Sequence, residues 1–270
     1  MLSRIRALFG CGELILSLTL FNLNAKYKGS FLGVLWSMLK PVCMMAVFSV
    51  VFQVIVRFDA GIPYPVFFLT GLLPWNFMSM SLSSGTNGLV DHANLIKKVA
   101  IPSETFILAI VLSNLVDLFL AFIVCFFFIL IFQVKVSAMV VFLPLVILLH
   151  CLFIFGLSLL FSAANVFFRD VRQMVEVGLL AWFYVSPILY SVDMVKASKP
   201  GLVAFYLCNP MAVFIALYRE VMVLGGMGVE GHDPISLSSY LLMALAWAVG
   251  AFLVGYAVFL RKEERFAELL

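Results

Sequence analysis

The sequence predicts an all-α integral membrane protein with six transmembrane helices. Two stretches, Met139 to Phe168 and Ser236 to Leu260, contain no Asp, Glu, Lys or Arg. An apolar run of 18 or more residues is long enough to cross a hydrocarbon core of about 30 Å as a helix. Of all residues, 64% are hydrophobic and 11% are charged, and the mean hydropathy is +1.16. Because no linker or change of composition divides the 270 residues, we expect one membrane domain, residues 1–270.

Six segments have the length and composition of spanning helices. They cover residues 34–56, 65–89, 105–133, 139–167, 174–192 and 237–260. If the N-terminus is cytoplasmic, eleven of the 17 Lys and Arg residues lie on the cytoplasmic side and five on the outer side, with Lys40 inside the first span. Cytoplasmic loops carry an excess of Lys and Arg, so this distribution predicts that both termini are cytoplasmic.

Residues 13–28, before the first span, are predicted to form an amphipathic helix. Leu14, Leu18, Phe21 and Ala25 recur at helical spacing, with Asn and Lys residues between them. Such a helix suits the inner membrane surface, where its basic end meets anionic headgroups. On the pattern alone, it is either an ordinary membrane anchor or part of a platform for a soluble partner.

The loop at residues 91–103, between the second and third spans, is short and basic. Three of its residues, Leu95, Ile96 and Val99, would form a one-turn apolar knob flanked by Lys97 and Lys98. That composition suits a short helix that inserts into a groove on a soluble partner. The alternative is a loop that only fixes the orientation of the chain through its positive charge.

Polar groups are rare inside the spans and at their inner ends. Asp117 is the only charged residue of the third span, and we expect it to face a cavity or a subunit interface. A proton relay needs several such groups, and only His150 lies comparably deep in another span. At the inner end of the fifth span, Arg169 and Arg172 could bind a pyrophosphate, because guanidinium groups match phosphate oxygens. Alternatively, Arg172 pairs with Glu176 one turn along the helix.

The segment at residues 187–220 is predicted to be re-entrant. Asn209-Pro210 and Arg219-Glu220 interrupt an apolar stretch, and a full crossing there would carry the basic C-terminal tail outside. Non-helical backbone at membrane depth is tolerated only where protein or a water-filled cavity covers it, so a re-entrant segment would line an aqueous space. The alternative is a broken helix that lies flat on the outer leaflet.

Aromatic residues make up 15% of the chain, and the richest group of Tyr and Trp lies near this outer segment. The candidates for a substrate path are Trp182, Tyr184, Tyr190, Tyr206 and Tyr218. Rings that stack and also form hydrogen bonds could guide a sugar polymer. Each of these rings could instead belong to the protein core, the lipid contact or an interfacial belt.

The residue patterns predict no cofactor, no metal and no nucleic acid in this chain. The phosphate-binding pattern GxxxxGK[ST] does not occur, so the chain is not expected to be an ATPase. The five cysteines form no CxxC pair and no metal-ligand spacing. The net charge of +3 is too small to indicate nucleic-acid binding.

Four segments share their order and spacing with one known family. They are KYKGSFLGVLWSMLKP (26–41), FLTGLLPWNFMSMSLSSGTNGLVDHANLIKKVAIPSE (68–104), NVFFRDVRQMVEVGLLAWFYVSPILY (165–190) and NPMAVFIALYRE (209–220). The chain resembles the permease subunits of ABC-2 type exporters, and more narrowly those that export lipid-linked polysaccharide such as O antigen. The terminal RFAELL (265–270) fits the O-antigen members as well.

The resemblance implies a homodimer in the bacterial inner membrane, bound to two copies of a separate ATPase subunit that holds ATP and Mg²⁺. In this family an interface helix would correspond to residues 13–28, a coupling loop to 91–103 and a re-entrant outer gate to 187–220. The implied substrate is a polyprenyl-pyrophosphate-linked glycan, moved outward.

Other functions remain open at this stage. Related ABC-2 exporters could move a small hydrophobic drug, a lipid, or a teichoic acid or capsule polymer. A membrane-embedded enzyme acting on lipid-linked sugars would need convergent acids or metal ligands, and an ion-coupled carrier typically has inverted repeats. We find neither pattern in the sequence.

Overall fold

Every regular element of the structure, a computed structural model, is a helix in the part of the chain that it describes, namely residues 10–57, 61–98, 101–191, 206, 208–224 and 237–270. Five helical segments are long and apolar enough to cross a membrane. They are Leu35–Ile55 (α3 and η1), Tyr64–Asp91 (α4), Glu104–Ile131 (α6), Ala138–Phe167 (η2 and α7) and Leu237–Arg265 (α12 and η5). The all-α membrane fold is confirmed, and these five segments match five of the predicted spans closely.

The predicted fifth span is shorter than expected. The structure has α8 at Val171–Val185, whereas the prediction was residues 174–192. Its 15 residues correspond to a helix of about 22 Å. The helix ends at Ser186, because the following Pro187 disfavours helical backbone at that residue. A sixth crossing therefore stays a prediction.

The core of the chain forms around α4, which contacts α3, α6, α7, α8 and the short helix α11 (Pro210–Arg219). The second large interface joins α7 and α12, where two glycines allow the backbones to meet. A Cβ on Gly255 would lie 1.9 Å from the Gly156 carbonyl oxygen. Small residues at such crossings are typical of membrane helix packing, which depends on close van der Waals contact.

Helix α11 lies against α4, α7 and α12, and its side chains at Val213, Phe214 and Ile215 are fully buried. Asn209 caps it, because its side-chain oxygen accepts a hydrogen bond from the Met211 backbone amide at 3.0 Å. A π-helical turn, η4 (Glu220–Leu224), follows it. Of the predicted segment 187–220, the structure describes residues 187–191, 206 and 208–220, and the remainder lies outside the described residues.

Helix α2 (Gly12–Tyr27) occupies the position predicted for the amphipathic helix, but its apolar side chains are not confined to one face. Leu14 and Leu18 pack beside Phe106 of α6. Leu16 and Leu20 are more than half exposed on another face of the helix. The one-sided pattern was therefore wrong, because the prediction considered one row of residues and overlooked the apolar residues between them.

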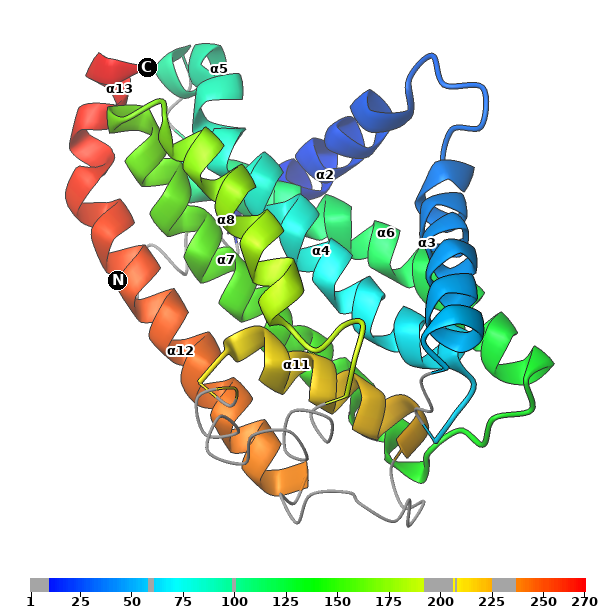
Figure 1. Cartoon of the computed structure of the whole chain (residues 1–270). Helices are drawn as coiled ribbons and strands as arrows, with labels where there is room; N and C mark the ends of the chain where they lie inside the picture. Colours follow the sequence, from blue (N-terminus) through cyan, green and yellow to red (C-terminus); the bar gives the residue numbers. More distant parts are fainter. Residues whose placement is uncertain (1–9, 58–60, 99–100, 192–205, 207, 225–236) are drawn as a thin grey trace.

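Figure 1 shows that α5 (Ala93–Lys98), α13 (Phe266–Leu269) and the junction of α7 with α8 lie at one end of the molecule. Helix α11 lies toward the opposite end, where α12 begins. Helix α3 stands apart from the main bundle, beyond α2. In the apolar stretch of 18 residues that qualifies this helix as a span, only 11% is buried, compared with 78% of the corresponding stretch in α4.

Candidate functional site

A cluster of polar side chains joins α2 to the middle of α6. Lys26 Nζ lies 3.0 Å from Asp117 Oδ2 and donates a second hydrogen bond to Asn114 Oδ1 at 2.5 Å. The Tyr27 hydroxyl donates to the other carboxylate oxygen of Asp117 at 2.5 Å. Asn114 also donates from Nδ2 to Ser84 Oγ of α4 at 3.3 Å. Asp117 is thus a buried ion-pair partner with both oxygens bonded, as a carboxylate at membrane depth requires.

Tyr27 is held as a hydrogen-bond donor in this cluster. Its burial, and then its hydrogen bond to Asp117, raise the pKa of the phenol to about 12. The hydroxyl is therefore protonated throughout the neutral range and stabilises the ionised carboxylate. His150 has different neighbours, since its ring stacks on Phe214 and its Nδ1 lies 3.4 Å from the Tyr218 hydroxyl. These separate partners give no support to a relay between Asp117 and His150.

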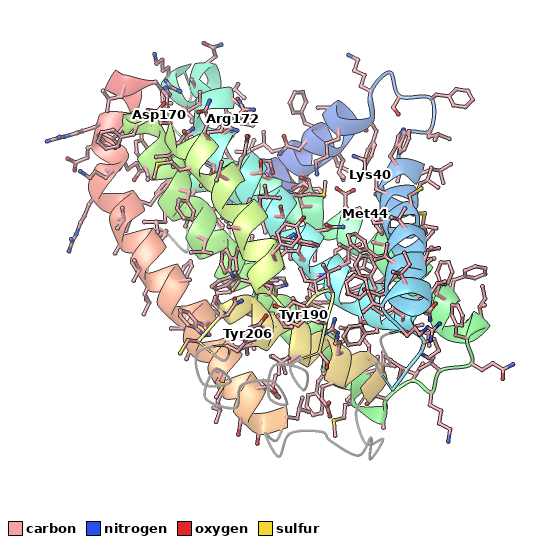
Figure 2. The ribbon with its side chains drawn as sticks, viewed as in Figure 1. Lys40, Met44, Asp170, Arg172, Tyr190 and Tyr206 are labelled. Atoms are coloured by element: carbon pink, nitrogen blue, oxygen red, sulfur yellow. The ribbon has the colours of Figure 1, made fainter. Side chains whose placement is uncertain are left out.

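The polar cluster borders a cavity of about 430 Å³ between α2, α3, α4 and α6. Its polar lining includes Lys26, Tyr27, Ser30, Ser37, Lys40, Asn76, Asn114 and Asp117. Its apolar lining includes Trp36, Pro41, Leu73, Phe77, Met80, Leu118 and Ala121. Figure 2 shows Lys40 beside α3, toward the space between that helix and α2. This cavity combines positive charge with apolar walls.

The predicted knob is only partly exposed. Helix α5 includes Leu95, Ile96, Lys97 and the backbone of Lys98, whereas Val99 lies outside the described residues. Leu95 is 45% exposed and Lys97 is exposed, but Ile96 packs beside Leu18 and Phe106. Leu95 and Lys97 therefore present the surface that a partner could reach, while Ile96 attaches α5 to α2 and α6.

Arg172 and Glu176 form the helix-surface pair that was one of the two predictions for this region. Arg172 Nε lies 3.1 Å from Glu176 Oε1, and both side chains are about half exposed. Figure 2 shows Arg172 and Asp170 at the N-terminal end of α8. Arg169 is exposed beside them. A pyrophosphate contact at Arg169 and Arg172 stays a prediction.

The five candidate aromatic residues do not form one surface in the described part of the chain. Tyr184 is 61% exposed on α8, whereas Tyr218 is fully buried in the core. Trp182 donates from Nε1 to Asn209 Oδ1 at 2.8 Å and so connects α8 to the start of α11. Tyr190 contacts Tyr206 with 6.1 Å between ring centroids (Figure 2). Tyr218 is therefore a core residue in this structure, and the others stay candidates for a substrate path.

Arg219 has a structural role that the sequence analysis did not predict, since it was noted there only as an interruption of an apolar stretch. It is 4% exposed, and its Nη2 donates to the backbone oxygens of Phe67 at 3.3 Å and Ile188 at 3.0 Å. Its guanidinium lies 3.7 Å from the centroid of the Phe67 ring. Gly71 leaves room for it, since a Cβ there would lie 2.7 Å from Nη2. Arg219 thus fastens α11 to α4 and to the chain that follows α8.

The family model of the ABC-2 type transporters matches residues 13–223. The chain belongs to the ABC-2 type transporter family. The match covers the structure from α2 to η4 and therefore includes the polar cavity, α5 and Arg219.

Several relatives extend the similarity of this ABC-2 transporter chain to nearly its whole length. It is 28% identical to an O-antigen export system permease protein RfbA of Klebsiella pneumoniae over 260 residues, which is 96% of this chain and 95% of the relative. It is 29% identical to the RfbA protein of Myxococcus xanthus over 269 residues, 99% of each chain. The polysialic acid transport protein KpsM of Escherichia coli is 24% identical over 253 residues, 92% of this chain and 93% of the relative.

Proposed function

We propose that this ABC-2 permease is the channel-forming subunit of an ATP-driven exporter that moves lipid-linked polysaccharide of the O-antigen type from the inner to the outer side of the bacterial inner membrane. The observation that carries this proposal is the full-length similarity to export permeases named for O antigen in two organisms. The all-helical structure with five candidate spans supports it.

The proposed topology has six crossings, with α8 as the fifth and both termini in the cytoplasm. Helix α11 has 10 residues, about 15 Å, so it is too short to cross a core of about 30 Å. Helix α8 ends, and α12 begins, toward the end of the molecule where α11 lies (Figure 1). These facts support a segment that enters the outer half of the membrane and returns, with Arg219 holding it in place.

The proposed assembly is a homodimer on two copies of an ATPase subunit, with ATP and Mg²⁺ bound by that subunit. Helix α8 carries an exposed apolar row at Met174, Val177, Leu180 and Tyr184. Helix α3 is also mostly unburied within one protomer. The row on α8 and the face of α3 turned away from the cavity are the surfaces we assign to the second copy and to the conduit between the copies. Leu95 and Lys97 of α5 are assigned to the ATPase contact.

The experiment is a deletion of this chain in its host, followed by measurement of lipid-linked glycan on each side of the inner membrane. We expect the glycan to accumulate on the cytoplasmic side and to return to the surface when the chain is restored with its ATPase. Unchanged surface glycan in the deletion strain would contradict the proposal.

A capsule-type polymer is the second candidate substrate, because the similarity to the polysialic acid transport protein also covers 92% of the chain. The same deletion separates the two candidates. Loss of capsule with intact lipopolysaccharide would favour the capsule polymer, and the reverse would favour O antigen.

A further inference from the structure

The cavity beside α3 carries one positive charge that the protein does not balance. Three charged residues line it, namely Lys26, Lys40 and Asp117, so their formal sum is +1. Lys26 and Asp117 neutralise each other in their ion pair. Lys40 forms no ion pair or hydrogen bond with any residue that the structure describes. Lys40 is exposed at the cavity, so an anion can reach this ammonium, which no other side chain neutralises.

The shape of the cavity indicates what kind of anion it accepts. Lys40 lies five residues after the start of α3, about 8 Å along the helix, near the end of α2. The hydroxyls of Ser30 and Ser37 lie at this same end. Farther along α6, the walls are apolar at Leu118 and Ala121. A ligand with an anionic head and an apolar tail would satisfy both ends.

The cavity also borders the surrounding membrane within a protomer. Most of the α3 span is not covered by other helices of the chain. Trp36, which lines the cavity, is 42% exposed, and tryptophan is enriched at the level of lipid headgroups. A lipid of the inner leaflet could therefore enter from the side.

We propose that this cavity binds the headgroup of an anionic phospholipid, with its phosphate at Lys40 and its acyl chain along Leu118 and Ala121. Charge decides between this lipid and the pyrophosphate of an export substrate. A phosphodiester has one negative charge, which matches the net charge of the lining, whereas a pyrophosphate has at least two. The bound lipid would connect α3 to the cluster around Lys26. This proposal does not depend on which solute is exported.

The test measures lipid binding to the purified full-length chain in a neutral detergent by native mass spectrometry and by thermal unfolding. Phosphatidylglycerol, phosphatidylcholine and a polyprenyl pyrophosphate are added in turn. We expect phosphatidylglycerol to bind more tightly than phosphatidylcholine and to raise the unfolding temperature. In Lys40→Gln, binding of phosphatidylglycerol should weaken roughly tenfold, as expected for the loss of a hydrogen bond to a charged group.

Two further variants make the result specific. Lys135→Gln removes an exposed lysine outside the spans, after α6, and should leave lipid binding unchanged. Lys40→Arg keeps the charge and should retain the preference for phosphatidylglycerol. Retained binding in this variant would show that the loss in Lys40→Gln comes from the missing charge and not from a change of the side chain as such. Equal binding of the two phospholipids, or equal losses in the Lys40→Gln and Lys135→Gln variants, would overturn the proposal. Lys40-dependent binding of polyprenyl pyrophosphate without phosphatidylglycerol binding would overturn it in favour of the substrate headgroup.

Discussion

Lys26 and Asp117 form an ion pair across α2 and α6, with 3.0 Å between Nζ and Oδ2. The two residues are 91 positions apart in the sequence. The carboxylate is 8% exposed and the lysine side chain 26% exposed, so the pair is shielded more than a surface pair. It connects α2, which precedes the first span, to α6, which follows α5 in the chain.

The ion pair should contribute clearly to stability. We expect Lys26→Met to lower the free energy of unfolding by about 3 kcal/mol, because it leaves the Asp117 carboxylate without its cation. The double variant Lys26→Met/Asp117→Leu should recover much of that loss, because no charge is then left unpaired. Thermal unfolding of purified protein checks both values.

The matched control is the exposed pair Arg172–Glu176. Arg172→Gln should change stability by less than about 0.5 kcal/mol, because solvent screens a surface pair of this kind. Equal effects at the two pairs would mean that Lys26–Asp117 has no special structural role.

Contact with the ATPase should depend on the exposed side of α5. We expect Leu95→Asp/Lys97→Glu to reduce export strongly while the chain stays folded in the membrane, because both side chains point away from the protomer. The measurement is export and ATP hydrolysis by the complex with its ATPase subunit. Ile96→Asp is the contrasting variant and should lower the folded yield, because Ile96 packs inside. Normal export by the double variant would exclude a docking role for these two residues.

The topology can be tested with single cysteines in a chain whose five native cysteines are replaced. We expect Lys135→Cys to react with an impermeant thiol reagent added outside the cell. Glu264→Cys should react only after the cell is opened, because in the proposed topology the segment between α8 and α12 does not cross the membrane. Labelling of position 264 from outside would mean that the segment around α11 crosses the membrane.

Arg219 should hold α11 against α4 and against the chain around Ile188. Arg219→Met removes two hydrogen bonds and the contact with the Phe67 ring, and we expect it to destabilise the protein by about 3 kcal/mol. Arg219→Lys should recover only part of this, because an ammonium does not reproduce the planar fork of a guanidinium. Protease cleavage between residues 187 and 209 should increase in both variants. Unchanged cleavage would show that Arg219 does not fasten this segment.

The sequence was sufficient for the positions of five spans, because long apolar runs and their polar boundaries depend only on neighbouring residues. It was insufficient for the partner of Asp117, because Lys26 comes from a helix that is apolar on several faces. It also misjudged Tyr218, since an aromatic residue in an apolar segment gives no indication of whether it faces a conduit or the core. The position of Lys40 in the first span was visible, but the cavity that it borders is formed by four helices whose lining residues run from Lys26 to Ala121 in the sequence.

The aromatic residues near the outer end give the last prediction, which separates a substrate path from structural packing. If Tyr184 and Tyr190 contact the exported glycan, Tyr184→Ala/Tyr190→Ala should lower export per folded dimer about tenfold, because each stacked ring contributes about 0.5–1.5 kcal/mol. Tyr190→Phe keeps the ring and removes the hydroxyl, which lies 3.1 Å from the Tyr184 backbone oxygen and 3.3 Å from the Val185 backbone oxygen, so it tests the contribution of the hydroxyl.

Tyr218 provides the contrast, because it is fully buried and lies beside His150 and Phe122. Tyr218→Ala should cost about 3–5 kcal/mol of stability through the cavity it leaves, and should reduce the amount of folded protein without changing export per dimer. The deciding measurement is surface glycan divided by folded dimer for each variant. If the double variant at Tyr184 and Tyr190 also lowers only the folded amount, these rings are packing residues and the glycan follows another path.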